Sequence, residues 1–586
     1  MKLKFRRIIA VFLLVVLTIL SVGCKNKNEV GGTIDNNKEK IESGEEEKPE
    51  YGGTLRVPLT TVETLNPLIS ENISYYNFSK LIFEGLFKLD KNLNIENQLA
   101  QNCEIKEDGK VIGIKLRENV VWHDGEKFTA KDVKFTIDTL KYAGNDNIYK
   151  NSILSNFKSY TSSDLRHIMD VKIIDDYNIE IVFDRAFSNG LEILTFPIIP
   201  RHIFVKGREN SSSYKAALAE DNYTPIGTGP YKFSKYEKIK SINLEANTNW
   251  WQGKPYISTI IGEIMKDEDL AMTSFEANQV DLTTSVGVDW EKYFQSKRVK
   301  IIEYVSQNYE LLGFNFSRKI FADEKGKELR KAIAYGIDRQ SIIQKVYMGH
   351  ATQVDLPIYP NSWLISDNSN IYGFNIDKAK EILSSAGYKD ENGDGFVEDE
   401  NGKTLTLKVT TNSYNPLRLK TADLIVENLK AIGINATKDY EDNVPNNITD
   451  EEVEEQWQKY TQKIKKGDFD IALMGWQLSD VCDLSFAFHS SQIYYGTNFI
   501  RYSDEEMDQL LFDAFSATNR EEKKKAYGKL EDKILEDLPY VSLFFRNEAL
   551  LIDKNIKGNI NPQSNNLYYN IEKWYIPKEF QEKNVD

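Results

Sequence analysis

Two hydrophobic periods alternate between positions 405 and 477, and this alternation restricts the possible folds more than any other feature of the chain. Leu405, Leu407 and Val409 are spaced two residues apart, which is typical of a strand. The apolar residues of 422–429 then recur three or four positions apart, as on one face of a helix. A strand followed directly by a helix indicates the first unit of an α/β sheet.

The same alternation continues to the end of this segment. Residues 434–437 are expected to be extended, and a second helix is expected to begin at Thr449, whose hydroxyl can cap it while Glu452 reaches back. Lysines precede Gly467 at the expected end of that helix. The apolar run of 469–476 then suits a central strand. The sequence therefore predicts an α/β fold with a lobe of the order strand, helix, strand, helix, strand.

The N-terminal half shows separate strand and helix signals. Two segments alternate apolar and polar residues, which predicts half-buried strands. Their apolar residues are Ile112, Ile114 and Leu116 in one, and Ile179, Ile181 and Phe183 in the other. Between them, Thr129 and Asp132 have the spacing of a capping box, so a helix is expected over 129–140.

Charge and composition exclude two classes of protein. The chain has 74 Lys and Arg against 89 Asp and Glu, a formal net charge of −15, whereas nucleic-acid binding relies on basic surface. Hydrophobic residues make up 41% and charged residues 28%, which is a globular composition and excludes a membrane protein with many spans. We therefore expect no nucleic-acid partner.

The first 50 residues are interpreted as a targeting segment and a tether. Basic residues precede an apolar run over 8–20, which is too short to span a bilayer and is typical of a signal peptide. The segment from Leu20 to Cys24 resembles a bacterial lipobox, so we expect a lipoprotein signal peptide at 1–23 and a lipid anchor on Cys24. Leu20 lies four positions before the cysteine instead of the usual three, which leaves ordinary cleavage or a retained anchor open. Residues 24–50 have no aromatic residue and are expected to form a disordered tether.

Motifs of a catalytic site are missing from the sequence. None of the five histidines is followed by glutamate, so there is no HExxH zinc motif, and there is no GxSxG elbow. The segment Gly227-Thr228-Gly229 lacks the third glycine of a dinucleotide-binding loop. We therefore expect no enzyme activity, no catalytic residue and no cofactor.

One segment imitates the beginning of a calcium-binding loop. Its oxygen-bearing side chains stand at alternate positions with glycine at the sixth, and the residues are Asp390, Asn392, Asp394, Gly395 and Glu398. The twelfth position is Asn401 rather than the bidentate glutamate that such loops require. We interpret the segment as a hairpin turn and predict no metal site, with calcium as the alternative.

A longer pattern points to a family. The segment 116–140, LRENVVWHDGEKFTAKDVKFTIDTL, resembles the signature of the family 5 extracellular solute-binding proteins, the oligopeptide and dipeptide receptors of ABC importers. Further motifs occur in that family's order: YGGTLRV at 51–57, TLNP at 64–67, IFEGLF at 82–87, PIGTGPYKF at 225–233, NTNWWQGKPY at 247–256, LRKAIAYGIDRQSII at 329–343 and FDIALMGWQ at 469–477. The resemblance therefore covers nearly the whole chain after the tether.

The resemblance implies a fold and a division of the chain. It implies a two-lobe, periplasmic-binding-protein-like fold of type II, cluster C, with an extra subdomain on lobe one. The expected parts are lobe one at 51–94, 215–311 and 547–586, the extra subdomain at 95–214, and lobe two at 312–546. A hinge is then expected near Leu311 and Phe545, where the chain crosses between lobes. Cys103 and Cys482 fall in different lobes, and a disulfide would lock the hinge, so we expect two free thiols.

The resemblance also implies a ligand and its contacts. Peptides in this family lie extended and are held through their main chain, in the manner of strand addition. By position, contacts are expected at Glu63 and at Gly475, Trp476 and Gln477. The implied role is that of a monomer that captures short peptides outside the membrane and delivers them to ABC permease subunits. Nickel chelates, haem, sugars and signalling peptides, which other family members bind, are the alternatives.

Two aspartates are candidates for binding the peptide's ammonium group, because a buried cation without a partner is costly. Oligopeptide receptors of this family place an aspartate three residues after the matching tryptophan. That position is Ser479 here, so either Asp480 or Asp483 takes the role, or the ligand has no free N-terminus. Near the hinge, Tyr309 and Phe314 are the aromatic residues expected in a pocket wall.

Overall fold

The structure is a computed structural model that describes part of the chain. The described residues are 48–581 without 151–166, 222, 286, 288–289, 367–369, 400 and 442–448. The predicted signal peptide, Cys24 and nearly all of the predicted tether lie outside the described residues. Among the helices that the structure describes, none is both long and apolar enough to cross a membrane.

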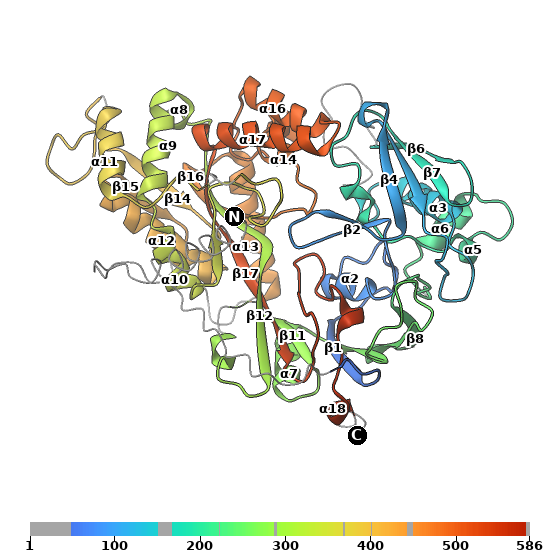
Figure 1. Ribbon diagram of the computed structural model, residues 1–586. Helices are drawn as coiled ribbons and strands as arrows, with labels where there is room; N and C mark the ends of the chain where they lie inside the picture. The colour runs from blue at the N-terminus through green and yellow to red at the C-terminus, as the bar shows by residue number, and fades with distance from the viewer. Residues whose placement is uncertain are drawn as a thin grey trace, which may run out of the picture. The chain divides into compact units, whose positions relative to one another are not determined.

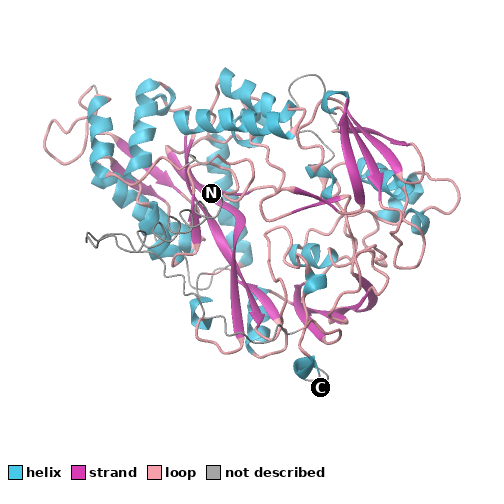
Figure 2. Ribbon diagram, in the orientation of Figure 1, coloured by secondary structure: helices cyan, strands magenta, loops and turns pink. Residues whose placement is uncertain are grey.

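A four-stranded sheet is formed by segments assigned to lobe one (Figures 1 and 2). Its order is β1-β10-β9-β8, with β1 parallel to β10 and the other pairs antiparallel. The strands are β1 (Thr54–Thr60), β8 (Tyr231–Glu237), β9 (Ser241–Ala246) and β10 (Thr259–Met265). Leu55, Val57 and Leu59 are buried and alternate with half-buried residues, so β1 presents one face to the core.

The predicted extra subdomain contains an antiparallel sheet of the order β4-β5-β7-β6. Its strands are β4 (Ala100–Lys106), β5 (Val111–Leu116), β6 (Ile168–Ile173) and β7 (Asn178–Phe183), and a small sheet of β2 (Phe87–Leu89) and β3 (Ile95–Asn97) precedes it. Both predicted strands are confirmed, since the apolar residues of β5 and β7 are buried. Helix α3 (Ala130–Ala143) also begins where expected, and the Thr129 N–H donates to the Asp132 carboxylate at 2.8 Å.

The third sheet has the order β11-β17-β12-β16-β14-β15, with β13 paired to β17. Its strands are β11 (Leu282–Ser285), β12 (Val299–Phe314), β13 (Ala351–Gln353), β14 (Thr406–Thr410), β15 (Asn435–Asp439), β16 (Ile471–Gln477) and β17 (Tyr540–Asp553). β15, β14 and β16 are parallel, and α12 (Pro416–Ala431) and α13 (Asp450–Lys466) lie between them in the chain. Thr449 and Glu452 form the capping box of α13, and Gly467 ends it. The predicted α/β alternation is confirmed.

The remaining helices are mostly short. They are α2 (Ile73–Ser79), α5 (Arg201–Phe204), α6 (Ser211–Ala217), α7 (Glu268–Glu276), α8 (Lys319–Ala322), α9 (Glu324–Gly336), α10 (Arg339–Tyr347), α11 (Ile376–Ser385), α14 (Ser485–Phe488), α15 (Gln492–Tyr495), α16 (Glu505–Ser516), α17 (Arg520–Asp537) and α18 (Lys578–Gln581). α11 packs against α9, and α16 packs against α17 (Figure 1).

Two long strands run from segments assigned to lobe one into segments assigned to lobe two. β12 and β17 lie side by side and pair along most of their length (Figure 1). Their register shifts between Val305 and Tyr309 and again between Glu310 and Leu311. Bulges bend and twist a strand, and these irregularities fall where the hinge near Leu311 and Phe545 is expected. The boundaries of the lobes stay a prediction.

Tyr309 and Phe314 belong to the core. Both are fully buried, and the Tyr309 hydroxyl lies 2.6 Å from the Ser542 hydroxyl. The expectation that these two residues form a pocket wall is therefore wrong, because β12 directs them into the hydrophobic core. Cys103 and Cys482 are free thiols at the margins of different hydrophobic clusters, as expected.

The motif IFEGLF places a carboxyl group inside the protein. Glu84 is 1% exposed, and its carboxyl oxygens accept hydrogen bonds from Trp251 Nε1 at 3.0 and 3.1 Å and from Gln98 Nε2 at 3.4 Å. Burial raises the pKa of Glu84 from 4.5 to about 7, although these hydrogen bonds oppose the rise. In the folded state, the Glu84 carboxyl group is therefore partly protonated near neutral pH.

Replacing Glu84 by glutamine is expected to change the pH dependence of stability. A raised pKa means that the stability contributed by the protonated carboxyl is complete below about pH 4.5 and is lost as the pH rises through about 7. Above that pH, E84Q should be more stable than the wild type by up to about 3 kcal/mol, and at pH 4 the two should be alike. Urea unfolding at several pH values measures the difference, with the exposed Glu521→Gln as the control. A difference that does not vary with pH contradicts the prediction.

Candidate functional site

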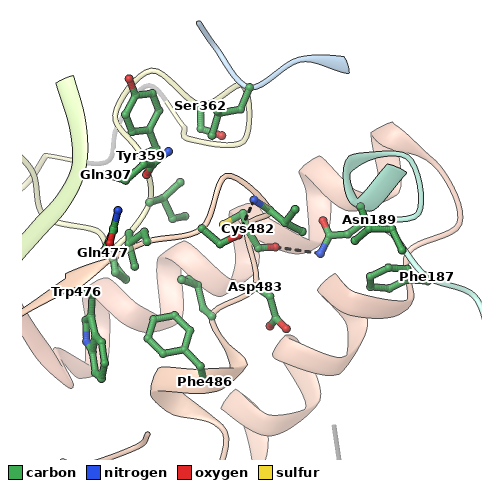
Figure 3. Close-up of a pocket in the computed structure, with 18 of the residues that line it drawn as sticks. Phe187, Asn189, Gln307, Tyr359, Ser362, Trp476, Gln477, Cys482, Asp483 and Phe486 are labelled. Carbon is green, nitrogen blue, oxygen red and sulfur yellow. Dashed lines mark hydrogen bonds between the residues drawn. The ribbon is translucent and has the colours of Figure 1, made fainter. Parts of the chain in front are cut away.

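A cavity of about 240 Å³ lies where β16 ends (Figure 3). Its walls come from both predicted lobes, including the crossing strand β12, and from the predicted extra subdomain. The lining residues are Leu93, His167, Phe187, Asn189, Ile193, Gln307, Pro357, Ile358, Tyr359, Ser362, Trp476, Gln477, Leu478, Ser479, Val481, Cys482, Asp483, Leu484 and Phe486. Trp476, Gln477 and Asp483, which the sequence nominated, are thus in one cavity.

Strand β16 pairs along its whole length on one edge, whereas the strand pairing on its other edge stops early, where the Leu473 carbonyl accepts a hydrogen bond from the Tyr460 hydroxyl at 2.9 Å. β12 pairs with β16 as far as Gln477, whereas β14 pairs with it only at Ile471 and Ala472. Beyond Ala472, the second edge of β16 therefore has no partner strand in the described sheet. Trp476 forms a wall there, stacked on Phe499 with ring centroids 5.7 Å apart.

Gly475 lies beside this cavity and is not among its lining residues. Its Cα faces a buried ion pair, in which the Arg418 guanidinium contacts the Glu310 carboxylate at 2.9 and 3.0 Å. A Cβ at position 475 would lie 2.1 Å from Arg418 Nη2. The absence of a side chain at Gly475 therefore makes room for the ion pair.

Asp483 is the only acidic residue among the described residues that line the cavity, and no lysine or arginine lines it. Its Oδ1 accepts a hydrogen bond from the Ser485 N–H at 2.9 Å. Burial raises the pKa of Asp483, and the hydrogen bonds from Ser485 oppose the rise. The cavity therefore suits a neutral or cationic group better than an anionic one.

Asp480 lies in a separate cavity of about 80 Å³, whose lining includes Lys80 and Lys88. Its Oδ1 accepts a hydrogen bond from Gln307 Nε2 at 2.9 Å. Burial raises the pKa of Asp480, while the charge of Lys80 and hydrogen bonds from Gln307 and Asn565 lower it. The two candidate aspartates thus face different spaces.

Glu63 lies apart from both aspartates and from Trp476. It is exposed and lines a different pocket, of about 530 Å³, together with Glu71, Glu220 and Asp221. The structure therefore does not bring Glu63 together with the other nominated residues.

Sequence reasoning missed the lining residues that come from distant segments, among them Asn189, Gln307 and His167. His167 stacks on Phe187 with ring centroids 4.2 Å apart, and burial lowers its pKa to about 4, so its imidazole is neutral. These residues lie outside the quoted motifs, so the sequence carried no signal for them.

A buried ion pair joins the predicted extra subdomain to lobe two beside the cavity. Lys523 of α17 donates to the Glu192 carboxylate and to Asn189 Oδ1, both at 2.6 Å. Asn189 Nδ2 in turn donates to the Cys482 carbonyl at 3.1 Å (Figure 3). Because Lys523 is 3% exposed, its charge relies on these partners rather than on water.

The calcium-like segment forms the expected turn. Lys389 and Thr404 each bridge to Glu398, and Asp390 accepts the N–H groups of Gly393 and Gly395 at 2.7 and 2.9 Å. Carboxylate oxygens of Asp390, Asp394 and Glu398 lie within 4.8 Å of one another. These acids largely bond their own loop, so we assign no metal to them.

Comparison with known proteins connects the chain to a family. Residues 94–492 match the sequence model for the middle part of the bacterial extracellular solute-binding proteins, family 5. This match covers more than half of the chain.

Individual relatives cover nearly all of the chain. The oligopeptide-binding protein AppA of Bacillus subtilis is 29% identical over 98% of this chain and 100% of that protein. Its solved structure, in complex with a nonapeptide, has a TM-score of 0.61 at 27% identity and covers 91% of this chain and 100% of that chain.

Two further relatives are described with ligands other than peptides. Heme-binding protein A of Haemophilus influenzae is 26% identical over 86% of this chain and 89% of that protein. The solved structure of NikZ from Campylobacter jejuni, in complex with Ni(L-His), has a TM-score of 0.64 at 27% identity and covers 90% of this chain and 100% of that chain.

Proposed function

The chain belongs to the bacterial extracellular solute-binding proteins of family 5, and from this premise we propose that it captures short peptides between two hinged lobes and presents them to the permease of an ABC transporter. The observation that carries the proposal is the cavity at the end of β16. It combines the end of β16, which has no second partner strand beyond Ala472 in the described sheet, with a described lining that has one carboxylate and no lysine or arginine. A strand edge without a partner strand suits a peptide main chain, and a carboxylate suits its ammonium group.

The size of the cavity favours a short ligand. Pockets for small ligands usually measure about 300 to 1,000 Å³, and this cavity of about 240 Å³ lies just below that range. We therefore propose peptides of a few residues as the preferred cargo.

Delivery requires that the lobes open and close. We retain the predicted lobes, 51–94 with 215–311 and 547–586 against 312–546, and place the hinge in β12 and β17. A ligand shifts such an equilibrium only if it binds the closed state more tightly than the open one. Contacts from both sides of the cavity provide that difference.

The sequence supports a place for this receptor at the outer face of a bacterial membrane. After removal of 1–23, Cys24 would carry the lipid, and 24–50 would tether the folded part. The receptor would act as a monomer, and we assign no catalytic role to any of its residues.

Native mass spectrometry of the purified protein tests the choice of ligand. We expect peptides of a few residues to co-purify and to be released by unfolding. Recovery of a nickel chelate, haem or a sugar in place of any peptide would contradict the peptide assignment while leaving the transport role intact.

Asp483→Asn is expected to weaken binding of a free-amine peptide roughly tenfold, which corresponds to about 1.4 kcal/mol. The N-acetylated peptide should bind both forms within about twofold, because it carries no ammonium. Isothermal titration calorimetry measures both constants, with the exposed Asp468→Asn as the control. If only Asp480→Asn separates the two peptides, the ammonium role belongs to Asp480, and if neither does, the ligand is not held by a free N-terminus.

A further inference from the structure

Gln307 is the point where the crossing strand meets both predicted lobes. Its backbone carbonyl accepts the Leu478 N–H at 2.9 Å, on the lobe-two side. Its backbone N–H donates to Ser564 Oγ at 3.2 Å, on the lobe-one side. Gln307 is 6% exposed, and its side chain lies in the cavity wall near Tyr359 and Gln477 (Figure 3). Gln307 is therefore a buried polar residue of the hinge strand that also faces the candidate ligand site.

The orientation of the Gln307 amide follows from its neighbour. Nε2 donates to Asp480 Oδ1 at 2.9 Å. This hydrogen bond uses the NH₂ end of the amide, so the amide oxygen is turned away from the Asp480 carboxyl oxygen that accepts it. The opposite orientation would place two oxygens against each other. Asp480 thus determines which end of the Gln307 amide faces the cavity.

The other end of the amide lacks a partner. Oε1 of Gln307 is buried, and no described residue donates a hydrogen bond to it. A buried acceptor without a donor is destabilising, and most buried polar groups have a hydrogen-bond partner. Nearby donors such as Gln477 and Ser479 line the same cavity, yet neither of them contacts Oε1.

We propose that Gln307 Oε1 accepts a hydrogen bond from an N–H group of the bound ligand, and that Asp480 is the positioning residue that turns the amide toward the ligand. The inference rests on the proposed function, since a peptide supplies the N–H. It gives Asp480 a role without contact to the ligand, which agrees with its place in the smaller cavity beside Lys80. It also places one ligand contact on the strand that joins the lobes, so ligand binding and hinge geometry meet at one residue.

Peptides that lack one N–H at a time test this inference. The affinities of alanine peptides of two to five residues are first measured by calorimetry. The peptide that binds most tightly is then synthesised in variants, each with one amide N–H replaced by N–CH₃, and in one further variant without its amino group. One replacement should weaken binding to the wild type five- to tenfold. With Gln307→Met, which has a similar size and no amide oxygen, the same replacement should cost less than about twofold. Steric effects of the methyl group remain in both proteins, so the difference isolates the hydrogen bond.

Asp480→Asn gives a second, independent readout. An asparagine offers both a donor and an acceptor, so the Gln307 amide is free to adopt either orientation. The N–H selectivity should therefore fall while the unmodified peptide still binds. The exposed Gln509→Met is the control and should keep the wild-type selectivity.

The possible outcomes distinguish failure of the Gln307 contact from failure of the proposed peptide function. If an alanine peptide binds and no N–H is coupled to Gln307, the inference is wrong and the peptide function stands. If Asp480→Asn discriminates a free amine from its acetylated form, Asp480 contacts the ligand directly and the positioning role is wrong. If no peptide binds the wild type, the proposed function fails, and the inference fails with it.

Discussion

Replacing Lys523 by methionine is expected to weaken ligand binding by about a hundredfold or more. Lys523 and Glu192 form a buried pair at 2.6 Å across the predicted extra subdomain and lobe two. Removing one partner of such a pair costs about 3 to 5 kcal/mol, because the other charge stays buried. If the lobes are hinged, opening them returns Glu192 to water, so the loss falls mainly on the closed state. Calorimetry measures the affinity, and small-angle X-ray scattering with ligand should show a larger radius of gyration for K523M.

The second partner supplies the decisive comparison. Glu192→Gln in the K523M background removes the buried charge, so affinity should recover in part. Lys525→Met, two residues further along α17 at an exposed position, should bind like the wild type. Wild-type affinity and wild-type scattering for K523M would show that the pair does not stabilise the closed state.

Much of the α/β lobe could be predicted because its signals are local. The capping box of Thr449 and Glu452, the glycine at 467 and the periods of α12 and β14 each act within a few residues, and all are found in place. The capping residues, the helix-ending glycine and the hydrophobic periods all indicate the same secondary structure, which is typical of natural sequences whose local preferences match the fold.

The crossing strand β12 was not recognised as a strand of 16 residues. A bulge inserts a residue and moves the following side chains to the opposite face, so the period of two breaks. The register shifts after Val305 and after Glu310 have this effect. Tyr309 and Phe314 were expected in a pocket wall because they lie near the hinge in the sequence, and nearness to the hinge does not determine which side of the strand a residue faces.

The candidate site was predictable only where one continuous segment builds it. Trp476, Gln477 and Asp483 lie within eight positions of one another and line the same cavity. Asn189 and Gln307 reach that cavity from segments more than 160 positions away, which only the folded chain brings together. Matching a motif by position cannot find such residues. It also nominated Glu63, which lines a different pocket and stays a prediction as a ligand contact.

Gly227→Ala is expected to lower the free energy of unfolding by about 3 kcal/mol or more. The motif PIGTGPYKF packs main chain against main chain: the Gly229 N–H donates to the Ile82 carbonyl at 2.9 Å, and the His123 N–H donates to the Gly227 carbonyl at 2.9 Å. A Cβ at position 227 would lie 1.8 Å from the Ile82 carbonyl oxygen. That oxygen belongs to the backbone, so no side-chain rotation relieves the clash, and overpacking of this kind forces backbone shifts. Urea unfolding and near-ultraviolet circular dichroism measure the loss.

Gly528 is the matched control because it tests the same change where space is open. It lies within α17, and a Cβ there would meet no atom within 4 Å. Alanine has the higher helix propensity, so Gly528→Ala should raise stability by about 0.5 to 1 kcal/mol. Opposite signs for the two substitutions would identify the backbone contact, rather than the loss of glycine flexibility, as the cause. Equal effects would mean that the backbone around Ile82 moves easily away from Gly227. The close packing at Gly227 would then add little to stability.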